Sequence, residues 1–212
     1  MHLNSGIKLK ICGMRDPENI LEVSALMPDY MGFIFFSKSP RYVMHNFELP
    51  ETLPPSIQKV GVFVNEANDV MLMHMHRLKL DYLQLHGQES LQQCEELKSE
   101  GGKIIKVFSV DENFNFDITK PYQEVADYFL FDTKGKLYGG NAQTFDWTIL
   151  NRYDQKVPFF LSGGLNPENV KEIGQLKNMN IHALDVNSGV ETAPGIKDSS
   201  KIERLIHVLY PQ

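Results

Sequence analysis

The sequence contains only two cysteines, Cys12 and Cys94, which stand far apart and outside any metal-binding spacing. A structural disulfide is therefore not expected, and two reduced thiols in a cytoplasmic protein are the simpler interpretation. His74 and His76 alternate with methionines on a helical segment, and we interpret them as packing and surface residues. With so few cysteines and no metal-binding spacing, the sequence predicts neither a disulfide framework nor a metal site.

An excess of positive charge and long apolar runs are also missing. The formal net charge is −6, which argues against nucleic acid as a partner because phosphate contacts need clustered Lys and Arg. An anionic ligand would have to be attracted by local groups. No apolar run approaches the ~18 residues of a membrane span, and the opening MHLNSGIKLK lacks the apolar core of a secretion signal. The sequence predicts a cytoplasmic protein without membrane contact.

Short apolar segments recur along the whole chain, and no linker-like segment divides them. They predict strands at 8–12, 30–36, 58–64, 81–85, 103–107, 128–131, 158–161 and 182–186. Eight strand–helix repeats of roughly 25 residues are typical of a (β/α)8 barrel, whereas a flavodoxin-like or Rossmann sheet needs only about five or six strands. We therefore predict one α/β domain over residues 1–212, a single (β/α)8 TIM barrel, with residues 1–6 as a loose extension.

Helix-type patterns are expected between most of the strands. The first opens at Asp16-Pro17-Glu18, with a capping residue and a proline in the first turn. Its inner face is predicted to carry Ile20, Leu21, Val23 and Leu26. Asn65 is expected to cap the helix at 66–78. Further helical segments are expected at 89–98, 120–126, 145–150 and 198–209, with a short proline-rich layer near 51–55.

The segment 159–191 carries two glycine turns in consecutive strand–helix units. A Ser-Gly-Gly turn follows one apolar strand and leads to a helix opened by Asn166-Pro167-Glu168, and Asn187-Ser188-Gly189 ends the next strand. Glycine lets backbone N–H groups approach a phosphate closely, and a helix N-terminus adds partial positive charge. Barrels commonly hold a phosphate after strands seven and eight. The pattern predicts a phosphorylated small-molecule ligand between the two turns.

Cys12 is the first of the chemically useful residues at the strand ends, where barrel enzymes place their catalytic groups. Lys10 lies two residues earlier and shares its face of the strand, so its ammonium would favour the thiolate of Cys12. Alternatively, Cys12 is a small buried apolar residue. Lys10 could instead only balance Asp185, because strands one and eight become neighbours when the barrel closes.

Asp132 ends the otherwise apolar strand YFLFD, where partial desolvation favours the protonated form and makes it a candidate acid as well as base. Its alternative role is to cap the following loop. His86 is either a proton carrier or a structural histidine before Gly87. Arg41 offers a planar fork suited to a carboxylate, or is a surface charge after a turn.

Taken together, the motifs resemble the phosphoribosylanthranilate isomerase family of tryptophan biosynthesis. The matching pieces, in family order over nearly the whole chain, are KICGMRDPENI, GFIFFSKSPRYV, KVGVFVN, LQLHG, FDT followed by GG and TFDW, LSGGLNPENV, and DVNSGVE with PGIKD. The resemblance implies an aldose–ketose isomerase that converts N-(5-phosphoribosyl)anthranilate into 1-(2-carboxyphenylamino)-1-deoxyribulose 5-phosphate. It also implies an Amadori rearrangement by proton transfer without a cofactor.

The resemblance further implies a role for each site residue. Asp132 would protonate the furanose ring oxygen, and Cys12 as thiolate would remove the C2 proton. Arg41 would hold the anthranilate carboxylate. His86 and Asp185 would bind the substrate, with Asp185 near the sugar hydroxyls. The phosphate would be bound by backbone N–H groups of Gly163, Gly164, Ser188 and Gly189.

One segment departs from the family pattern, the stretch Gly139-Gly140-Asn141-Ala142-Gln143 before TFDW. Ala142 replaces a glycine, and Gln143 stands where lysine is frequent in the family. The loop 134–143 is expected to close over the substrate, so its flexibility and product release are expected to differ. Asn187, where serine is common, is a tolerated polar exchange.

Two other kinds of protein remain as alternatives. Indole-glycerol-phosphate synthase needs a lysine–glutamate pair at the strand ends, and ribulose-phosphate epimerase needs metal-binding His and Asp pairs; neither set is found. A non-catalytic regulatory barrel would be expected to have lost Cys12 or Asp132, and both are present. The oligomeric state, monomer or homodimer, is left open.

Overall fold

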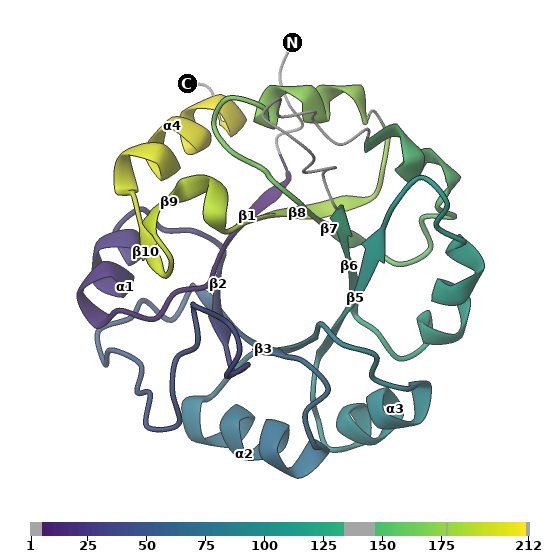
Figure 1. Ribbon diagram of the computed structural model, residues 1–212, viewed down its shortest axis with the longest axis horizontal. Coiled ribbons are helices and arrows are strands. Elements are labelled where there is room, and N and C mark those ends of the chain that lie inside the picture. The colour runs from purple at the N-terminus through teal and green to yellow at the C-terminus, as the bar shows by residue number, and fades with distance from the viewer. Residues whose placement is uncertain (1–5, 134–146, 177, 211–212) are drawn as a thin grey trace.

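The computed structural model describes residues 6–133, 147–176 and 178–210. Eight parallel strands close into a barrel in sequence order, with β8 beside β1 (Figure 1). The strands are β1 Lys8–Cys12, β2 Tyr30–Ile34, β3 Gln58–Phe63, β4 Tyr82–Leu85, β5 Ile104–Val110, β6 Tyr128–Thr133, β7 Phe159–Ser162 and β8 Ile181–Val186. The predicted (β/α)8 barrel is confirmed.

The closure places residues from the two ends of the chain side by side. Lys10 of β1 is the register partner of Asp185 of β8, and Cys12 lies opposite Gly32 of β2. On the far side of the barrel, Asp132 of β6 lies opposite Ser162 of β7. Parallel strands bring their carboxyl ends to one rim, so the predicted site residues meet there.

The outer layer of the barrel combines α-helices with short 3-10 helices (Figure 1). The α-helices are α1 Pro17–Ser24, α2 Asn68–Leu78, α3 Leu91–Ser99 and α4 Ser199–Leu209. The 3-10 helices are η1 Phe116–Tyr122, η2 Trp147–Arg152, η3 Val170–Gln175 and η4 Ser188–Val190, and a small hairpin joins β9 Glu191–Ala193 to β10 Ile196–Lys197. None of the helices in the described part of the chain is long and apolar enough to cross a membrane.

Side-chain caps explain where three of the α-helices begin. Asp16 accepts from the backbone N–H of Asn19 before Pro17 at the first helical position, as predicted. Ser90 caps α3, and Asp198 caps α4 with bonds from two N–H groups of the first turn. The predicted cap at Asn65 is wrong, because α2 starts after Ala67 without a side-chain cap.

Several predicted helices differ from the structure. The segment between β2 and β3 contains turns and no helix. The helix predicted at 120–126 overlaps only the end of the 3-10 helix η1, which carries Pro121 and so lacks an N–H that an α-helical bond needs there. On α1, Leu21 is 40% exposed and so does not belong to the predicted inner face. The predicted extension 1–6 lies almost wholly outside the described residues.

Aromatic side chains fill the N-terminal end of the barrel interior. The Tyr30 hydroxyl lies 2.7 Å from Nε2 of His182, and Tyr30 packs edge-to-face on Tyr82 and Phe160. Tyr128 stacks against His182 with ring centroids 4.1 Å apart. Burial lowers the pKa of His182 to about 4, so the ring is neutral near pH 7. This cluster fills the barrel beneath the polar residues at the carboxyl ends of the strands.

Candidate active site

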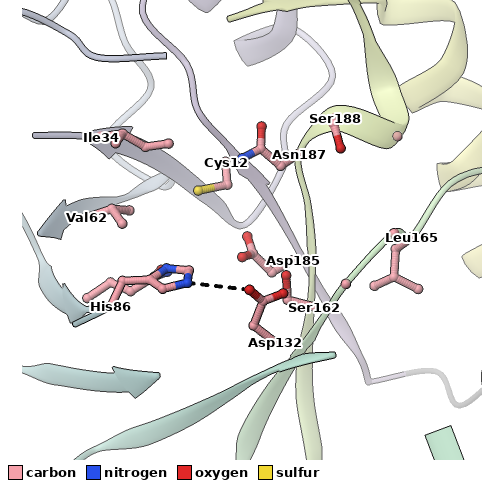
Figure 2. A pocket seen from close by; sticks show the side chains of 14 residues that line it. Cys12, Ile34, Val62, His86, Asp132, Ser162, Leu165, Asp185, Asn187 and Ser188 are labelled. Carbon is pink, nitrogen blue, oxygen red and sulfur yellow. Dashed lines mark hydrogen bonds and ion pairs between the residues drawn. The ribbon is translucent and has the colours of Figure 1, made fainter. Parts of the chain in front are cut away.

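A pocket opens at the carboxyl ends of the strands (Figure 2). It brings together eight of the nine residues predicted for the site, and Arg41 is the exception. The lining residues are Cys12, Ile34, Val62, Gln84, His86, Asp132, Ser162, Gly163, Gly164, Leu165, Asp185, Asn187, Ser188 and Gly189. Sequence reasoning missed Gln84 of β4, although it stands two residues before His86, a spacing that places side chains on the same side of an extended chain.

Cys12 ends β1 and is 4% exposed. Its sulfur has room because position 32 on the neighbouring strand is glycine, where an added Cβ would lie 2.8 Å from the sulfur. Burial raises the pKa of the Cys12 thiol, although Lys10 and Lys197 act in the opposite direction. Lys10 favours the thiolate, as predicted, but its effect does not decide the net direction of the Cys12 pKa. Desolvation outweighs the nearby ammonium groups.

Lys10 is fully buried beneath the pocket and forms an ion pair with Asp185. Its Nζ lies 2.8 Å from Asp185 Oδ1 and 2.7 Å from Gln84 Oε1. Burial lowers the pKa of Lys10, but the neighbouring Asp185 and Cys12 together outweigh it, and the net effect is a raised pKa. Lys10 therefore pairs with Asp185, as the alternative predicted, but it also acts on Cys12. Asp185 is therefore tied into the floor of the pocket.

His86 and Asp132 face each other across the pocket (Figure 2). Nε2 of His86 lies 3.5 Å from Oδ2 of Asp132, and Nδ1 of His86 lies 3.2 Å from the side-chain nitrogen of Gln84. About a third of each side chain in the His86–Asp132 pair is exposed. A small ligand in the pocket could therefore contact both groups.

The turn that carries His86 is fixed from behind by a buried ion pair. Lys106 Nζ donates to Glu89 Oε2 at 2.8 Å and to the carbonyl of Gly87 at 2.9 Å. Glu89 also accepts from the backbone N–H groups of Asn65 and Gly87. Both charged side chains are almost completely buried. The pair therefore locks the β4–α3 turn.

Arg41 does not line the pocket but is paired with Glu191. Its Nε and Nη2 donate to the two carboxylate oxygens at 2.8 and 2.6 Å. Lys197 donates to the same carboxylate at 2.7 Å. Although burial raises the pKa of Glu191, hydrogen bonds from Arg41, Lys197 and the Gly195 N–H lower it to about 2. An added Cβ at Gly13 would lie 2.7 Å from Cδ of Arg41. The arginine side chain therefore passes close to the backbone of Gly13, the residue that follows Cys12.

The two glycine turns lie against each other at the ends of β7 and β8. An added Cβ at Gly189 would overlap the carbonyl oxygen of Leu165, so only glycine allows this approach. Gly163 and Gly164 have φ of 106° and 66°. Within the described residues, the backbone N–H groups of Gly164, Ser188 and Gly189 donate to no other described protein group. Their residues line the pocket, and backbone N–H donors suit an anion.

The α-helix predicted to begin at Asn166-Pro167-Glu168 is absent from the turn after β7. The Asn166 side chain accepts from the N–H groups of Glu168 and Asn169, and Asn169 Nδ2 donates to the carbonyl of Gly164. This turn leads into the short η3. An anion at this turn would therefore be bound by the individual backbone N–H groups rather than by a long helix dipole.

The part of the chain described by the structure contains no group of three or more His, Cys, Asp or Glu that could hold a metal ion. The loop 134–143, with Ala142 and Gln143, lies outside the described residues. Its predicted closure over the substrate stays a prediction.

Comparison with known proteins decides between the phosphosugar enzymes that share this fold. A sequence profile described as N-(5'phosphoribosyl)anthranilate (PRA) isomerase matches residues 9–208. The chain belongs to this family. It is an isomerase of tryptophan biosynthesis, converting phosphoribosylanthranilate into the carboxyphenylamino-deoxyribulose phosphate. The predicted family and activity are confirmed.

Relatives of the isomerase align over nearly their whole length. The N-(5'-phosphoribosyl)anthranilate isomerase of Phocaeicola vulgatus is 44% identical, and the match covers 95% of this chain and 97% of that protein. The isomerase of Parabacteroides distasonis is 42% identical, covering 96% and 94%. These identities exceed what a shared barrel alone would give.

Solved isomerase structures have the same fold. The phosphoribosyl anthranilate isomerase of Thermotoga maritima is 36% identical with a TM-score of 0.82, covering 96% of this chain and 98% of that one. A phosphoribosyl anthranilate isomerase in complex with reduced 1-(o-carboxyphenylamino)-1-deoxyribulose 5-phosphate is 33% identical with a TM-score of 0.80, over the same shares. A third structure, of monomers generated from the dimeric Thermotoga maritima enzyme, is 31% identical with a TM-score of 0.80, covering 97% and 100%.

Proposed function

We propose that the isomerase uses Cys12 as general base and Asp132 as general acid. The observation that carries the proposal is their placement on β1 and β6, on opposite sides of one pocket whose rim between them carries the glycine turns of β7 and β8. A substrate held by its phosphate at those turns would present its ribose to both groups. A general acid and a general base on opposite sides of the substrate suit a reaction in which the substrate gains one proton and loses another.

The reaction begins with ring opening. Asp132 in its acid form gives its proton to the furanose ring oxygen, and the C1–O bond breaks as the amino nitrogen forms a C=N bond to C1. The product of this step is a cationic Schiff base and an Asp132 carboxylate. His86, 3.5 Å from that carboxylate, binds beside the reacting oxygen.

The second step moves the proton from C2. Cys12 as thiolate takes it, the C2 electrons form a C1=C2 bond, and the C=N electrons return to nitrogen. The enolamine then becomes the ketone by gaining a proton at C1 and losing one from the C2 hydroxyl. Burial disfavours the thiolate in the free protein, and the ammonium groups of Lys10 and Lys197 stabilise it when it forms.

The remaining assignments concern binding. Gly163, Gly164, Ser188 and Gly189 hold the phosphate through backbone N–H groups, which supply partial positive charge. Asp185, held by Lys10, accepts from a sugar hydroxyl. Arg41 holds the anthranilate carboxylate with the donors that Glu191 leaves available.

Steady-state kinetics test the acid–base assignment. Cys12→Ala and Asp132→Asn should each lower kcat by several orders of magnitude, because each removes one obligatory proton transfer; general acid–base catalysis contributes about 10²–10⁴ per group. Loss of anthranilate-type fluorescence follows turnover. The variant Cys94→Ala is a matched control, because Cys94 is buried on α3 away from the pocket. Near-normal kcat in either site variant would refute the assignment.

We also propose that the chain is one domain that works in the cytoplasm as a monomer or homodimer. Support comes from the single closed barrel of eight strands and from two free buried thiols, which suit a reducing compartment. Sedimentation at several protein concentrations distinguishes monomer from dimer. Cooperative unfolding in one transition, seen by two probes, is expected for one domain, and two separate transitions would contradict it.

A further inference from the structure

At the floor of the pocket, three buried polar side chains from separate strands form a continuous line. Lys10 of β1 donates to Asp185 of β8 at 2.8 Å and to Gln84 of β4 at 2.7 Å. Lys10, Gln84 and Asp185 are 0, 1 and 5% exposed. Water is therefore excluded from these contacts, and each group must take its partner from the other two or from the pocket.

The chemistry of Lys10 decides how the Gln84 amide is oriented. An ammonium group has only donors, so the atom of Gln84 that faces it must be the carbonyl oxygen. The amide NH2 of Gln84 then points the other way, where Nδ1 of His86 lies 3.2 Å from it. An NH2 group can only donate there, so Nδ1 must accept through its lone pair. The single proton of the neutral imidazole is left on Nε2.

The Nε2 edge is the one that faces Asp132, with Nε2 and Oδ2 3.5 Å apart (Figure 2). In this tautomer the ring nitrogen nearest the carboxyl oxygen carries an N–H group, which can donate once ring opening leaves Asp132 as a carboxylate. In the other tautomer a lone pair would point at it and would repel the carboxylate that forms after proton transfer. The orientation of one buried amide therefore controls whether His86 stabilises or opposes the charge that develops on Asp132.

We propose that Gln84 is a positioning residue of the isomerase reaction: oriented by Lys10, it fixes His86 as the Nε2–H tautomer, which donates to Asp132 during ring opening. The proposal rests on the acid role of Asp132 given above. The fixed charge of Lys10 supports it, because Asp185 and Cys12 together keep the ammonium protonated against the effect of burial. A glutamate at position 84 would reverse the arrangement, since its carboxylate offers only acceptors to both neighbours.

Nitrogen NMR of the uniformly 15N-labelled enzyme tests the tautomer directly. The His86 ring signals are assigned by their loss in His86→Gln. Nδ1 of His86 should show the shift of an unprotonated ring nitrogen and Nε2 that of a protonated one. The reverse pattern, or an equal mixture of the two tautomers, overturns the proposal. This measurement needs no turnover, so its result is independent of the roles proposed for Cys12 and Asp132.

Gln84→Glu tests the consequence for catalysis. It keeps the side-chain length and the acceptor for Lys10, and it should move the His86 proton to Nδ1 in the same NMR experiment. We expect kcat to fall roughly 10- to 100-fold, below the loss for removing a whole transition-state donor, with KM changed less than about threefold. Unchanged kcat despite a moved proton would overturn the proposal.

Double variants separate positioning from a general structural effect. In the His86→Gln background, Gln84→Glu should cost less than about threefold further in kcat, because the group through which Gln84 acts is already gone. Gln84→Met, which removes the amide without adding charge, should lower kcat in the wild-type background and not in His86→Gln. Full additive losses in both double variants would overturn the proposal. Loss of turnover in Cys12→Ala with an intact His86 tautomer would leave it standing.

Discussion

Arg41 and Glu191, which are 150 residues apart in the sequence, form a two-point ion pair beside the pocket. Nε and Nη2 of Arg41 donate to separate oxygens of the carboxylate at 2.8 and 2.6 Å. Glu191 thereby occupies one edge of the Arg41 guanidinium. A substrate carboxylate would have to use the remaining donors or replace Glu191, which fixes the side from which it approaches.

Arg41→Lys should raise KM about 10- to 100-fold, with a smaller effect on kcat. Lysine keeps the charge but lacks the planar fork, and a hydrogen bond to a charged group is worth about 1.5–3 kcal/mol. Steady-state kinetics on phosphoribosylanthranilate measure the change. Lys38→Ala, at an exposed position near the same turn, serves as control. A lower kcat at constant KM would contradict a binding role for Arg41.

The Arg41–Glu191 pair should also appear in the acid stability of the protein. The pKa of Glu191 is about 2 in the native state against 4.5 ordinarily. A lowered native pKa stabilises the fold fully above about pH 4.5, and this contribution disappears as the pH falls towards 2. Urea unfolding should therefore show wild type more stable than Glu191→Gln at pH 7, with the difference shrinking below pH 4.5.

Glu168→Gln is the matched control for that experiment, because Glu168 forms only an exposed pair with Arg204 at 3.4 Å. Such pairs contribute little to stability. Its difference from wild type should be small at every pH. A Glu191→Gln difference that stays constant from pH 7 to pH 3 would contradict the lowered pKa.

Lys106→Met should destabilise the fold strongly. It leaves the buried Glu89 carboxylate without its cation, and breaking one side of a buried pair costs about 3–5 kcal/mol. Glu89→Gln combined with Lys106→Met should recover part of the loss, since no buried charge remains. Urea unfolding provides the comparison. Lys120→Met, which breaks an exposed pair with Asp117, should change stability little, and equal effects of the two single variants would refute the prediction.

Gly189→Ala should weaken phosphate binding. The added methyl group would overlap the carbonyl of Leu165 and force the two glycine turns apart. We expect KM and the inhibition constant of inorganic phosphate to rise together, by about tenfold, which corresponds to about 1.4 kcal/mol. Gly6→Ala, where an added Cβ meets nothing within 4 Å, is the control. A change in KM without a change in phosphate inhibition would place the phosphate elsewhere.

The strands could be predicted closely from the sequence because a buried strand is a local apolar pattern. The predicted range 58–64 corresponds to β3 Gln58–Phe63, and 8–12 is identical to β1 Lys8–Cys12. Helices on the outer layer were predicted less well. A short amphipathic segment has the same pattern in a 3-10 helix as in one α-helical turn, so η1 and η3 were expected as α-helices.

The candidate site also divides into residues that the local sequence pattern placed correctly and residues that it missed. Strand-end position alone placed Cys12, Asp132 and the two glycine turns at one rim, because in a parallel barrel the strand direction decides the rim. Gln84 was missed because an isolated glutamine in LQLHG carries no signal of its own. Its importance comes from Lys10 and His86, which meet it only after folding.

The sequence by itself determined the order of the strands, the family and the set of groups at the rim, since these depend on local patterns and ordered motifs. Only the tertiary structure decided what surrounds each group. It set the direction of the Cys12 pKa, because burial depends on the closed barrel. It also paired Arg41 with Glu191 and oriented the Gln84 amide, because hydrogen bonds between distant segments exist only once the chain brings them within reach.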